Sequence, residues 1–347
     1  MAKTKLEKDV TFSKLSYELY LNSRVPISEL VDKLMTSHQT TSRYIKELEK
    51  DYGLDYTIDI DTTLLGFTEA RIFAIKFDAR PEVKTLKNRL IKDHYVQNAY
   101  LATGDFDLIL HVICTSEVEY IKWLFKFRVE FSNYRSIIKV ATLNDVAEGF
   151  MPIRNELIKY SNKINETEKK IMKVLLSNSR IRQKSLIRQT NITQMRVIYV
   201  LKKLVERGII RRFTATIQNP NNKIFLFFAL VIIPNQHHKP QLQASLIKEI
   251  INRKEVNQLT TDYSVVYDTS GHFDSVFFCN FKDGASLDNS GPNLFNRVWE
   301  SEYPKIEKAI LTDLVIGKWP FNNNAYKHWE DIILKELNHP TKYNIIP

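Results

Sequence analysis

Residues 21–34 read LNSRVPISELVDKL, and residues 177–190 read SNSRIRQKSLIRQT, so an Asn-Ser-Arg stretch followed by a helical apolar pattern recurs 156 positions along the chain. Residues 44–54, YIKELEKDYGL, are similar to residues 200–210, VLKKLVERGII, and the first copy has one extra residue before its glycine. Self-similarity at a fixed spacing marks a structural unit that occurs more than once. The chain therefore carries two copies of this segment, called A and A′ here.

The segments that follow A and A′, called B and B′ here, are also similar to each other. Gly104-Asp-Phe-Asp107 in the first half is answered by Gly271-His-Phe-Asp274 in the second. The order A, B, A′, B′ predicts a duplicated two-domain unit of roughly 150 residues or slightly more.

A and A′ have the periodicity of short helices, with apolar residues three and four positions apart. In A these stripes are Leu15, Leu19 and Leu21, then Ile27, Leu30, Val31 and Leu34, then Tyr44, Ile45 and Leu48; in A′ they are Ile171, Val174 and Leu175, then Leu186 and Ile187, then Val197, Val200, Leu201 and Leu204. Gly53 and Gly208 end the third helices, and an extended segment follows each. Three short helices, the last two joined by a tight turn, and a following strand predict a winged helix-turn-helix.

B and B′ alternate between strand and helix patterns. In B we expect strands over 70–77, 96–103, 106–114 and 136–143 with helices over 81–92 and 117–130; in B′ we expect strands over 224–233, 258–267, 273–280 and 306–315 with helices over 241–252 and 294–302. This β-α-β-β-α-β order is the ferredoxin-like arrangement. Helices cover one face of such a sheet, and we expect a second sheet to cover the other.

The fold class predicted from these patterns is α+β, with two winged helix-turn-helix domains alternating with two ferredoxin-like domains. The expected boundaries are 1–62 and 63–147 for the first pair, 148–219 (a linker helix and the second helix-turn-helix) and 220–318 for the second pair, and 319–347 for a C-terminal helical extension. The extension carries an amphipathic stripe, which predicts a helix over about 325–337.

Composition excludes several classes of protein. The 347 residues include only two cysteines, Cys114 and Cys279, which excludes a disulfide scaffold and a Cys₄ zinc site. The longest apolar run, 224–233, is about half of what a membrane-spanning helix needs. The N-terminus is too charged for a secretory signal, so we expect a cytoplasmic protein that does not enter a membrane.

Sequence motifs of enzymes are missing as well. The nine glycines form neither a dinucleotide-binding nor a P-loop motif, and the chain contains neither H-E-x-x-H nor G-x-S-x-G. The adjacent His237 and His238 lie in a polar loop with no third ligand nearby in the sequence, so we expect no metal site there. The sequence predicts no catalytic residue and no cofactor, and the protein is expected not to be an enzyme.

An Asn-Ser-Arg stretch after the first helix, a glycine closing the third, and a β-α-β-β-α-β domain with Gly-x-Phe-Asp at its hairpin resemble the Lrp/AsnC (feast/famine) transcription regulators. The resemblance is carried by 21–24, 29–30, 48–49, Gly53 and the linker 59–67 in the first half, and by 178–180, 204–210 and 271–274 in the second. It covers roughly residues 10–147 and 163–317 and implies a sequence-specific regulator that binds double-stranded DNA. Family members usually carry one unit and pair through the ferredoxin-like (RAM-type) domain, so the tandem form implies a pseudo-dimer within the chain or a homodimer.

The net charge of +10 is concentrated in one segment. Residues 1–60 carry nine Lys and Arg against ten Asp and Glu, a net of −1, whereas residues 161–220 carry fourteen against three, a net of +11. The rest of the chain carries 27 of each sign. Phosphate binding concentrates cations in this way, because each neutralised phosphate releases counterions.

These cations and the third helices give the candidate DNA contacts. Phosphate contacts are expected from Arg180, Arg182, Lys184 and Arg188 around the second helix of A′, from Lys202 and Lys203, and from Arg207, Arg211 and Arg212 at its wing. Base contacts are expected from the first turns of the third helices, that is from Thr193, Gln194, Arg196 and Tyr199 in A′ and from Gln39, Thr40, Arg43 and Tyr44 in A. Gln pairs with adenine and Arg with guanine, so these residue types suit base recognition.

The family resemblance also implies a small effector, often an amino acid, near the hairpins of the paired B domains. The candidate residues are Gly104, Asp105, Asp107, Gly271 and Asp274, although glycine and aspartate at such positions can serve the turn alone.

Three alternatives stay open at this stage. A could have become a protein-contact domain that no longer binds DNA. The whole protein could be a nucleoid-associated protein that organises chromatin with little sequence preference. Siroheme decarboxylases resemble the same two-domain architecture, but the segments 98–103 and 259–265, which correspond to their hairpin rich in His, Tyr and Arg, contain no histidine.

Overall fold

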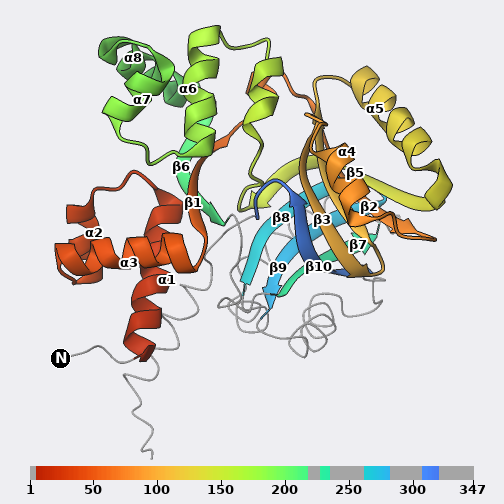
Figure 1. Cartoon of the computed structure of the whole chain (residues 1–347), viewed down its shortest axis with the longest axis horizontal. Helices are drawn as coiled ribbons and strands as arrows, with labels where there is room; N and C mark the ends of the chain where they lie inside the picture. The colour runs from red at the N-terminus through yellow and green to blue at the C-terminus, as the bar shows by residue number, and fades with distance from the viewer. Residues whose placement is uncertain (1–4, 218–226, 235–261, 282–306, 320–347) are drawn as a thin grey trace, which may run out of the picture.

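The structure of this chain is a computed structural model that describes residues 5–217, 227–234, 262–281 and 307–319. Its elements, in chain order, are α1 (Lys5–Leu21), α2 (Ile27–Leu34), α3 (His38–Asp51), β1 (Leu54–Ile60), η1 (Thr63–Leu65), β2 (Glu69–Phe77), α4 (Val83–Leu90), β3 (Val96–Gly104), β4 (Leu108–Cys114), α5 (Glu117–Glu130), η2 (Ser132–Tyr134), β5 (Ser136–Glu148), η3 (Asn155–Tyr160), α6 (Glu166–Ser177), α7 (Gln183–Thr190), α8 (Gln194–Glu206), β6 (Ile210–Ile217), β7 (Phe227–Pro234), β8 (Asp262–Gly271), β9 (Phe273–Phe281) and β10 (Glu307–Ile316). Figure 1 shows two groups of helices side by side at one end and a barrel of strands at the other.

The two helical groups repeat each other at the predicted spacing. We call α1–α3 with β1 the N-terminal head, and α6–α8 with β6 the C-terminal head. Helices α2 and α7 start and end 156 residues apart, and both are closed by a residue in the left-handed region, Met35 at φ 48° and Asn191 at φ 54°. This confirms the helix-turn-helix in each half. Leu21 is 44% exposed, so the expectation that it faces inward with Leu15 and Leu19 was wrong.

The strands that follow the third helices do not form a separate wing in each half. Strand β1 pairs with β6 in antiparallel fashion from Leu54↔Ile217 to Ile60↔Ile210, which makes one two-stranded sheet between the heads. An isolated strand exposes a row of unpaired N–H and C=O groups, and each strand here satisfies those of the other. This pairing was not predicted, because it joins residues 150 or more positions apart in the sequence.

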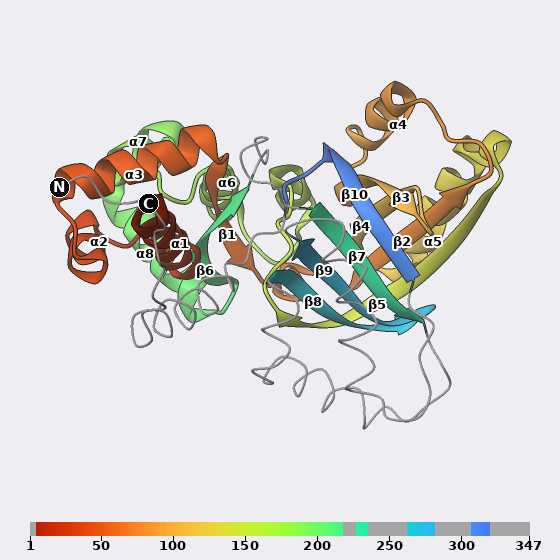
Figure 2. The same cartoon turned by 90° about the horizontal axis from the view of Figure 1, so that it is seen from below.

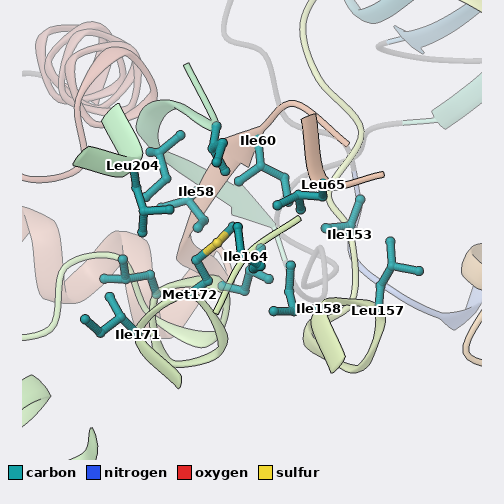
Figure 3. Packing of buried hydrophobic residues seen from close by; sticks show 14 of the residues in the cluster. Ile58, Ile60, Leu65, Ile153, Leu157, Ile158, Ile164, Ile171, Met172 and Leu204 are labelled. Carbon is teal, nitrogen blue, oxygen red and sulfur yellow. The ribbon is translucent and has the colours of Figure 1, made fainter. Parts of the chain in front are cut away.

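The two heads share their hydrophobic cores through this sheet. Ala215 of β6 is fully buried in the core of the N-terminal head, and Ile58 and Ile60 of β1 lie in the core of the C-terminal head. Figure 3 shows these two isoleucines packed in one cluster with Met172 of α6 and Leu204 of α8. Neither head has a complete core without the strand of the other half.

The ferredoxin-like halves join into one closed barrel with the strand order β10-β3-β4-β2-β5-β8-β9-β7. Within each half the order is that of a β-α-β-β-α-β sheet. The seams between the halves are β5 with β8 and β3 with β10 (Figure 2). This confirms that the two B domains pair within the chain and that each sheet covers the other. Strand β5 extends beyond the predicted 136–143 to Glu148, because its extra residues pair with β8 as far as Val266.

The barrel separates two layers of side chains. Its interior is filled by a cluster that includes Tyr100, Phe106, Tyr267, Phe273 and Phe278, each no more than 2% exposed. The outer face of the first half packs against α4 and α5 through Leu86, Leu90, Trp123 and Phe127. An eight-stranded barrel is just wide enough to be filled in this way. The predicted helices over 241–252, 294–302 and 325–337, and the pair His237 and His238, lie outside the described residues.

Candidate nucleic-acid interface

The first turns of α8 present polar side chains to solvent. Val197, Val200 and Leu204 are buried against the head, so the residues between them point outward. Thr193 is the N-cap residue, and Gln194 and Arg196 are exposed behind it. Tyr199, one turn further, is 48% exposed. The structure therefore brings all four base-contact candidates of this half onto the accessible surface around the start of the helix.

A cationic groove of about 690 Å³ runs along the same helix, between α8 and the loop that leads into α6. Lys163, Arg196, Lys203 and Arg207 line it together with Tyr199. The Arg196 guanidinium lies 5.6 Å and the Lys203 ammonium 4.9 Å from the centre of the Tyr199 ring. Two cations therefore lie within cation–π distance of one exposed aromatic ring. Positive charge next to an aromatic surface suits the binding of a polyanion.

The N-terminal head offers fewer such groups. Ser37 caps α3 by accepting a hydrogen bond from the Thr40 amide at 3.1 Å, and Gln39 and Arg43 are exposed. Thr40 is half-buried, its hydroxyl bonded to Ser37.

Tyr44 is not on this surface. It is 4% exposed and packs edge-on against Phe12 with ring centres 4.9 Å apart, so its prediction as a base contact was wrong. At the 156-residue spacing Tyr44 matches the buried Val200, and Tyr199 matches the exposed Arg43.

Exposed cations distinguish the C-terminal head. Five cations of this head are exposed: Arg182, Lys184, Arg188, Lys202 and Lys203. Lys202 pairs with Glu206 at 3.6 Å, and both of these side chains are well exposed. Such pairs are weak and are readily exchanged for a phosphate. The N-terminal head has exposed cations too, but carboxylates lie beside several of them: Lys8 pairs with Glu47, and Lys33 pairs with Glu18 and Glu29.

Arg180 lies at the contact between the heads and not on the outer surface. Its guanidinium donates to the Ser23 carbonyl at 3.2 Å and sits 5.5 Å from the Tyr56 ring centre. Arg24, its counterpart, donates to the Ser179 carbonyl at 2.7 Å and stacks on Phe213 at 4.2 Å. The repeated Asn-Ser-Arg stretch therefore joins the two heads.

Arg211 and Arg212 were expected at a wing, and instead carboxylates of the other half hold them. Arg212 pairs with Asp59 at 3.1 Å and donates to the Tyr20 hydroxyl, while Arg211 pairs with Asp61 at 2.9 Å. Both contacts follow from the pairing of β1 with β6. Burial raises the pKa of Asp59, and the two arginines offset this only in part.

Arg207 is likewise engaged at the edge of the cationic groove. It pairs with Glu168 of α6 at 2.8 Å and also donates to the Lys163 carbonyl. Its side chain remains 42% exposed, so it can still face an anion in the groove.

The effector candidates lie at the barrel seams and have structural partners. Gly104 has φ +111° and Gly271 φ +113°, and a Cβ on either would lie within 3 Å of the carbonyl oxygen of Lys308 or Val140 on the facing strand. Asp105 accepts from the Lys308 amide at 2.8 Å. The Asp274 side chain lies outside the described residues.

Asp107 is buried under a network of donors. Arg80, Lys76 and the Phe77 amide all donate to its carboxylate. Burial alone would raise the pKa of Asp107, but these hydrogen bonds outweigh it and the pKa lies below the usual value. The network ties the β3–β4 hairpin to the end of β2.

One buried histidine was not predicted from the sequence. His111 of β4 is 4% exposed, and neither ring nitrogen has a hydrogen-bond partner among the described residues. Burial lowers its pKa to about 4. Alternation along β4 from Ile109 places this ring on the barrel-facing side.

The described part of the chain contains neither a candidate membrane span nor a candidate metal site. None of the helices there is long and apolar enough to cross a membrane. Groups of three or more His, Cys, Asp or Glu side chains that could hold a metal ion do not occur in the same part of the chain.

Comparison with known proteins links this geometry to a family. A family model described as winged helix-turn-helix DNA-binding matches residues 164–211. The HTH-type transcriptional regulator Ptr1 of Methanocaldococcus jannaschii is 32% identical over 125 residues, which cover 36% of this chain and 76% of Ptr1. The HTH-type transcriptional regulator FL11 of Pyrococcus abyssi is 24% identical over 126 residues, 36% of this chain and 76% of FL11.

Similarity over nearly the whole length is found among solved structures. The siroheme decarboxylase NirDL superposes with a TM-score of 0.58 and 15% identity, covering 96% of this chain and 100% of that chain. At this identity the likeness establishes the tandem α+β fold and no activity. The match to Ptr1 over three quarters of that regulator, together with the repeated heads, shows that this chain belongs to the Lrp/AsnC-type family of winged helix-turn-helix regulators.

Proposed function

We propose that this protein is a sequence-specific DNA-binding transcription regulator whose base contacts come from the first turns of α8 and α3. The observation that carries the proposal is the exposed pair Gln194 and Arg196 beside a groove lined with cations. Helix-turn-helix proteins insert this part of the second helix of the motif into the major groove. The remaining candidates are Thr193 and Tyr199 on α8 and Gln39, Thr40 and Arg43 on α3.

Phosphate contacts belong to the exposed cations of the C-terminal head. Arg182, Lys184, Arg188, Lys202 and Lys203 have no buried carboxylate partner among the described contacts, so DNA can recruit them without breaking the fold. Arg180 and Arg212 stabilise the contact between the heads and are assigned that role instead, whereas Arg207 and Arg211 pair with carboxylates but stay partly exposed and remain candidates for phosphate contacts.

Selection of binding sites from a random pool of duplex oligonucleotides tests the proposal. We expect enriched sites with two related but non-identical halves, separated by whole helical turns of roughly 10 base pairs. A specific-to-random affinity ratio near one would support a chromatin-organising protein instead. Failure to bind duplex DNA at all would overturn both interpretations.

Alanine substitutions then show which of the two heads contacts bases. We expect Arg196→Ala and Arg43→Ala each to weaken binding to the selected site by about 1–3 kcal/mol, the discrimination of one good base contact. Arg128→Ala, on the exposed face of α5, is the matched control. If only Arg196→Ala weakens binding, the N-terminal head does not contact bases.

Effector binding at the seams stays a separate prediction. Gly104, Asp105 and Gly271 already serve the barrel closure, and Asp107 ties the β3–β4 hairpin to the end of β2, which accounts for their presence without a ligand. Calorimetric titration with the common amino acids tests it.

A second candidate is a decarboxylase for an acidic tetrapyrrole, favoured by the full-length likeness to NirDL. Against it, the barrel interior is packed with aromatic side chains, so a tetrapyrrole would have to displace them or bind elsewhere. An absorbance titration with siroheme separates the candidates. We expect no shift in the Soret region.

A further inference from the structure

We propose that one chain is a complete, preassembled pair of heads that binds a single non-palindromic DNA site, with one half-site for each head. This inference rests on the proposed DNA-binding function and specifies its partner. The contact between the heads and the differences between their exposed residues support it.

The contact between the heads is reciprocal, as across a two-fold axis. The Ser23 and Ser179 hydroxyls, equivalent at the 156-residue spacing, hydrogen-bond each other at 2.6 Å, and both side chains are fully buried. Across the same point Arg24 donates to the Ser179 carbonyl, and Arg180 donates to the Ser23 carbonyl. The two copies of one motif thus form the centre of the contact.

The strands extend this exchange. Thr57 of β1 donates to the Leu176 carbonyl in the C-terminal head at 3.0 Å, and Thr214 of β6 donates to the Tyr20 carbonyl in the N-terminal head at 2.6 Å. Tyr20 and Leu176 are again equivalent residues, each near the end of the first helix of its head. Because each strand is hydrogen-bonded to and packed in the other head, separating the heads would expose both cores.

The recognition surfaces, in contrast, are not equivalent. At the 156-residue spacing Gln39 matches Met195, Thr40 matches Arg196, and Arg43 matches Tyr199. A symmetric pair of heads requires a palindromic site, because operator symmetry mirrors protein symmetry. Heads with different side chains at three exposed or half-exposed positions favour half-sites of different sequence.

Mixing two defective proteins tests whether a single chain suffices. One variant carries Gln39→Ala and Arg43→Ala, the other Gln194→Ala and Arg196→Ala, and binding to the selected site is measured for each alone and for an equimolar mixture. We expect each variant to bind at least tenfold more weakly than the parent, and the mixture to bind no better than its stronger component. Restoration of parental affinity on mixing would overturn the inference, because paired heads would then come from two chains.

Other outcomes separate the inference from the function on which it rests. A perfectly palindromic selected site, or full affinity for the N-terminal head variant, overturns the inference and leaves DNA binding intact. No binding by the parent protein overturns the proposed function itself.

A disulfide across the two-fold contact provides a measurement that does not depend on DNA. The variant Ser23→Cys/Ser179→Cys is oxidised with diamide and analysed on a non-reducing gel and by peptide mass spectrometry, with Ser23→Cys alone as control. We expect a bond within one chain and DNA affinity within about twofold of the reduced form. A covalent dimer, or loss of binding on oxidation, would contradict a preassembled single-chain pair.

Discussion

Neighbouring residues on α3 have opposite roles. Arg43 is exposed and its guanidinium lies 5.3 Å from the ring of Tyr44, which is buried against Phe12 in the core of the N-terminal head. A helix turns by 100° per residue, so two adjacent positions can differ completely in exposure. The roles of the two side chains can therefore be separated by substitution.

Replacing Tyr44 should damage stability, whereas replacing Arg43 should damage DNA binding. We expect Tyr44→Ala to lower the free energy of unfolding by about 3 kcal/mol, the cost of a large cavity in a core. Arg43→Ala should lower it by less than about 1 kcal/mol, since it removes only an exposed cation–π contact. Urea unfolding of both variants measures this, and equal losses would contradict the assignment.

His111 should make stability depend on pH. Its folded pKa of about 4 lies below the ordinary value of 6.5, so the unfolded chain binds more protons between these values. The stabilising contribution is therefore complete above pH 6.5 and is lost as pH falls towards 4. At pH 5 the loss relative to pH 7 should be about 2 kcal/mol, at 1.36 kcal/mol per pKa unit.

Unfolding by urea at pH 7 and pH 5 checks this prediction. His111→Leu should remove the additional loss at pH 5, while His38→Gln, at an exposed position on α3, should retain it. An unchanged pH dependence in His111→Leu would show that other groups are responsible.

At the scale of elements, the barrel depends on how closely its two seams pair. Strand β3 meets β10 at Gly104↔Ala309, and β5 meets β8 at Ala141↔Gly271, so each seam has a glycine facing an alanine. Both glycines have positive φ and a carbonyl oxygen of the opposite strand next to the missing Cβ. The two sheets can close only where these side chains are absent.

Gly104→Ala should therefore open or strain a seam. A Cβ would stand 2.7 Å from the backbone oxygen of Lys308, whereas at Gly208, also of positive φ, the nearest atom would be a Leu64 methyl at 3.7 Å. Strained backbone costs about 1–3 kcal/mol in either variant. We expect a distinctly larger fall in Tm for Gly104→Ala than for Gly208→Ala, and equal falls would show that no clash occurs at the seam.

Across the whole molecule, charge is divided between holding the heads together and facing solvent. The segment 161–220 carries a net +11, yet its Arg211 and Arg212 are paired with Asp61 and Asp59 of the first half. The exposed cations on and beside α7 and α8 make up a large part of the remainder. The surface available to DNA is thus less basic than the local count and more confined to the C-terminal head.

Salt dependence distinguishes these two groups of cations. Arg188→Gln should reduce the slope of log K against log salt by about 0.9, the value for one lost phosphate contact. Arg212→Gln should leave the slope unchanged and lower Tm instead, because it leaves the buried Asp59 without its partner. A reduced slope for Arg212→Gln would mean that DNA competes for this side chain.

The sequence by itself determined the local elements and their repetition. The bounds of α5, Glu117–Glu130, agree with the predicted helix to the residue, because helical periodicity and the Ser116 cap are local signals. The tight turn between the second and third helices was likewise expected from the apolar stripes on either side of it, and the structure places it at 35–37 and at 191–193.

Only the tertiary structure decided which strands and charges meet. Pairing of β1 with β6, and hence the partners of Arg180, Arg211 and Arg212, joins residues 150 or more positions apart, and periodicity carries no information about such contacts. The prediction for Tyr44 was wrong because it rested on an alignment of the two heads that was shifted by one residue. On a helix such a shift exchanges an outward position for an inward one. Closure of the barrel depended on two distant glycines that let one backbone approach another.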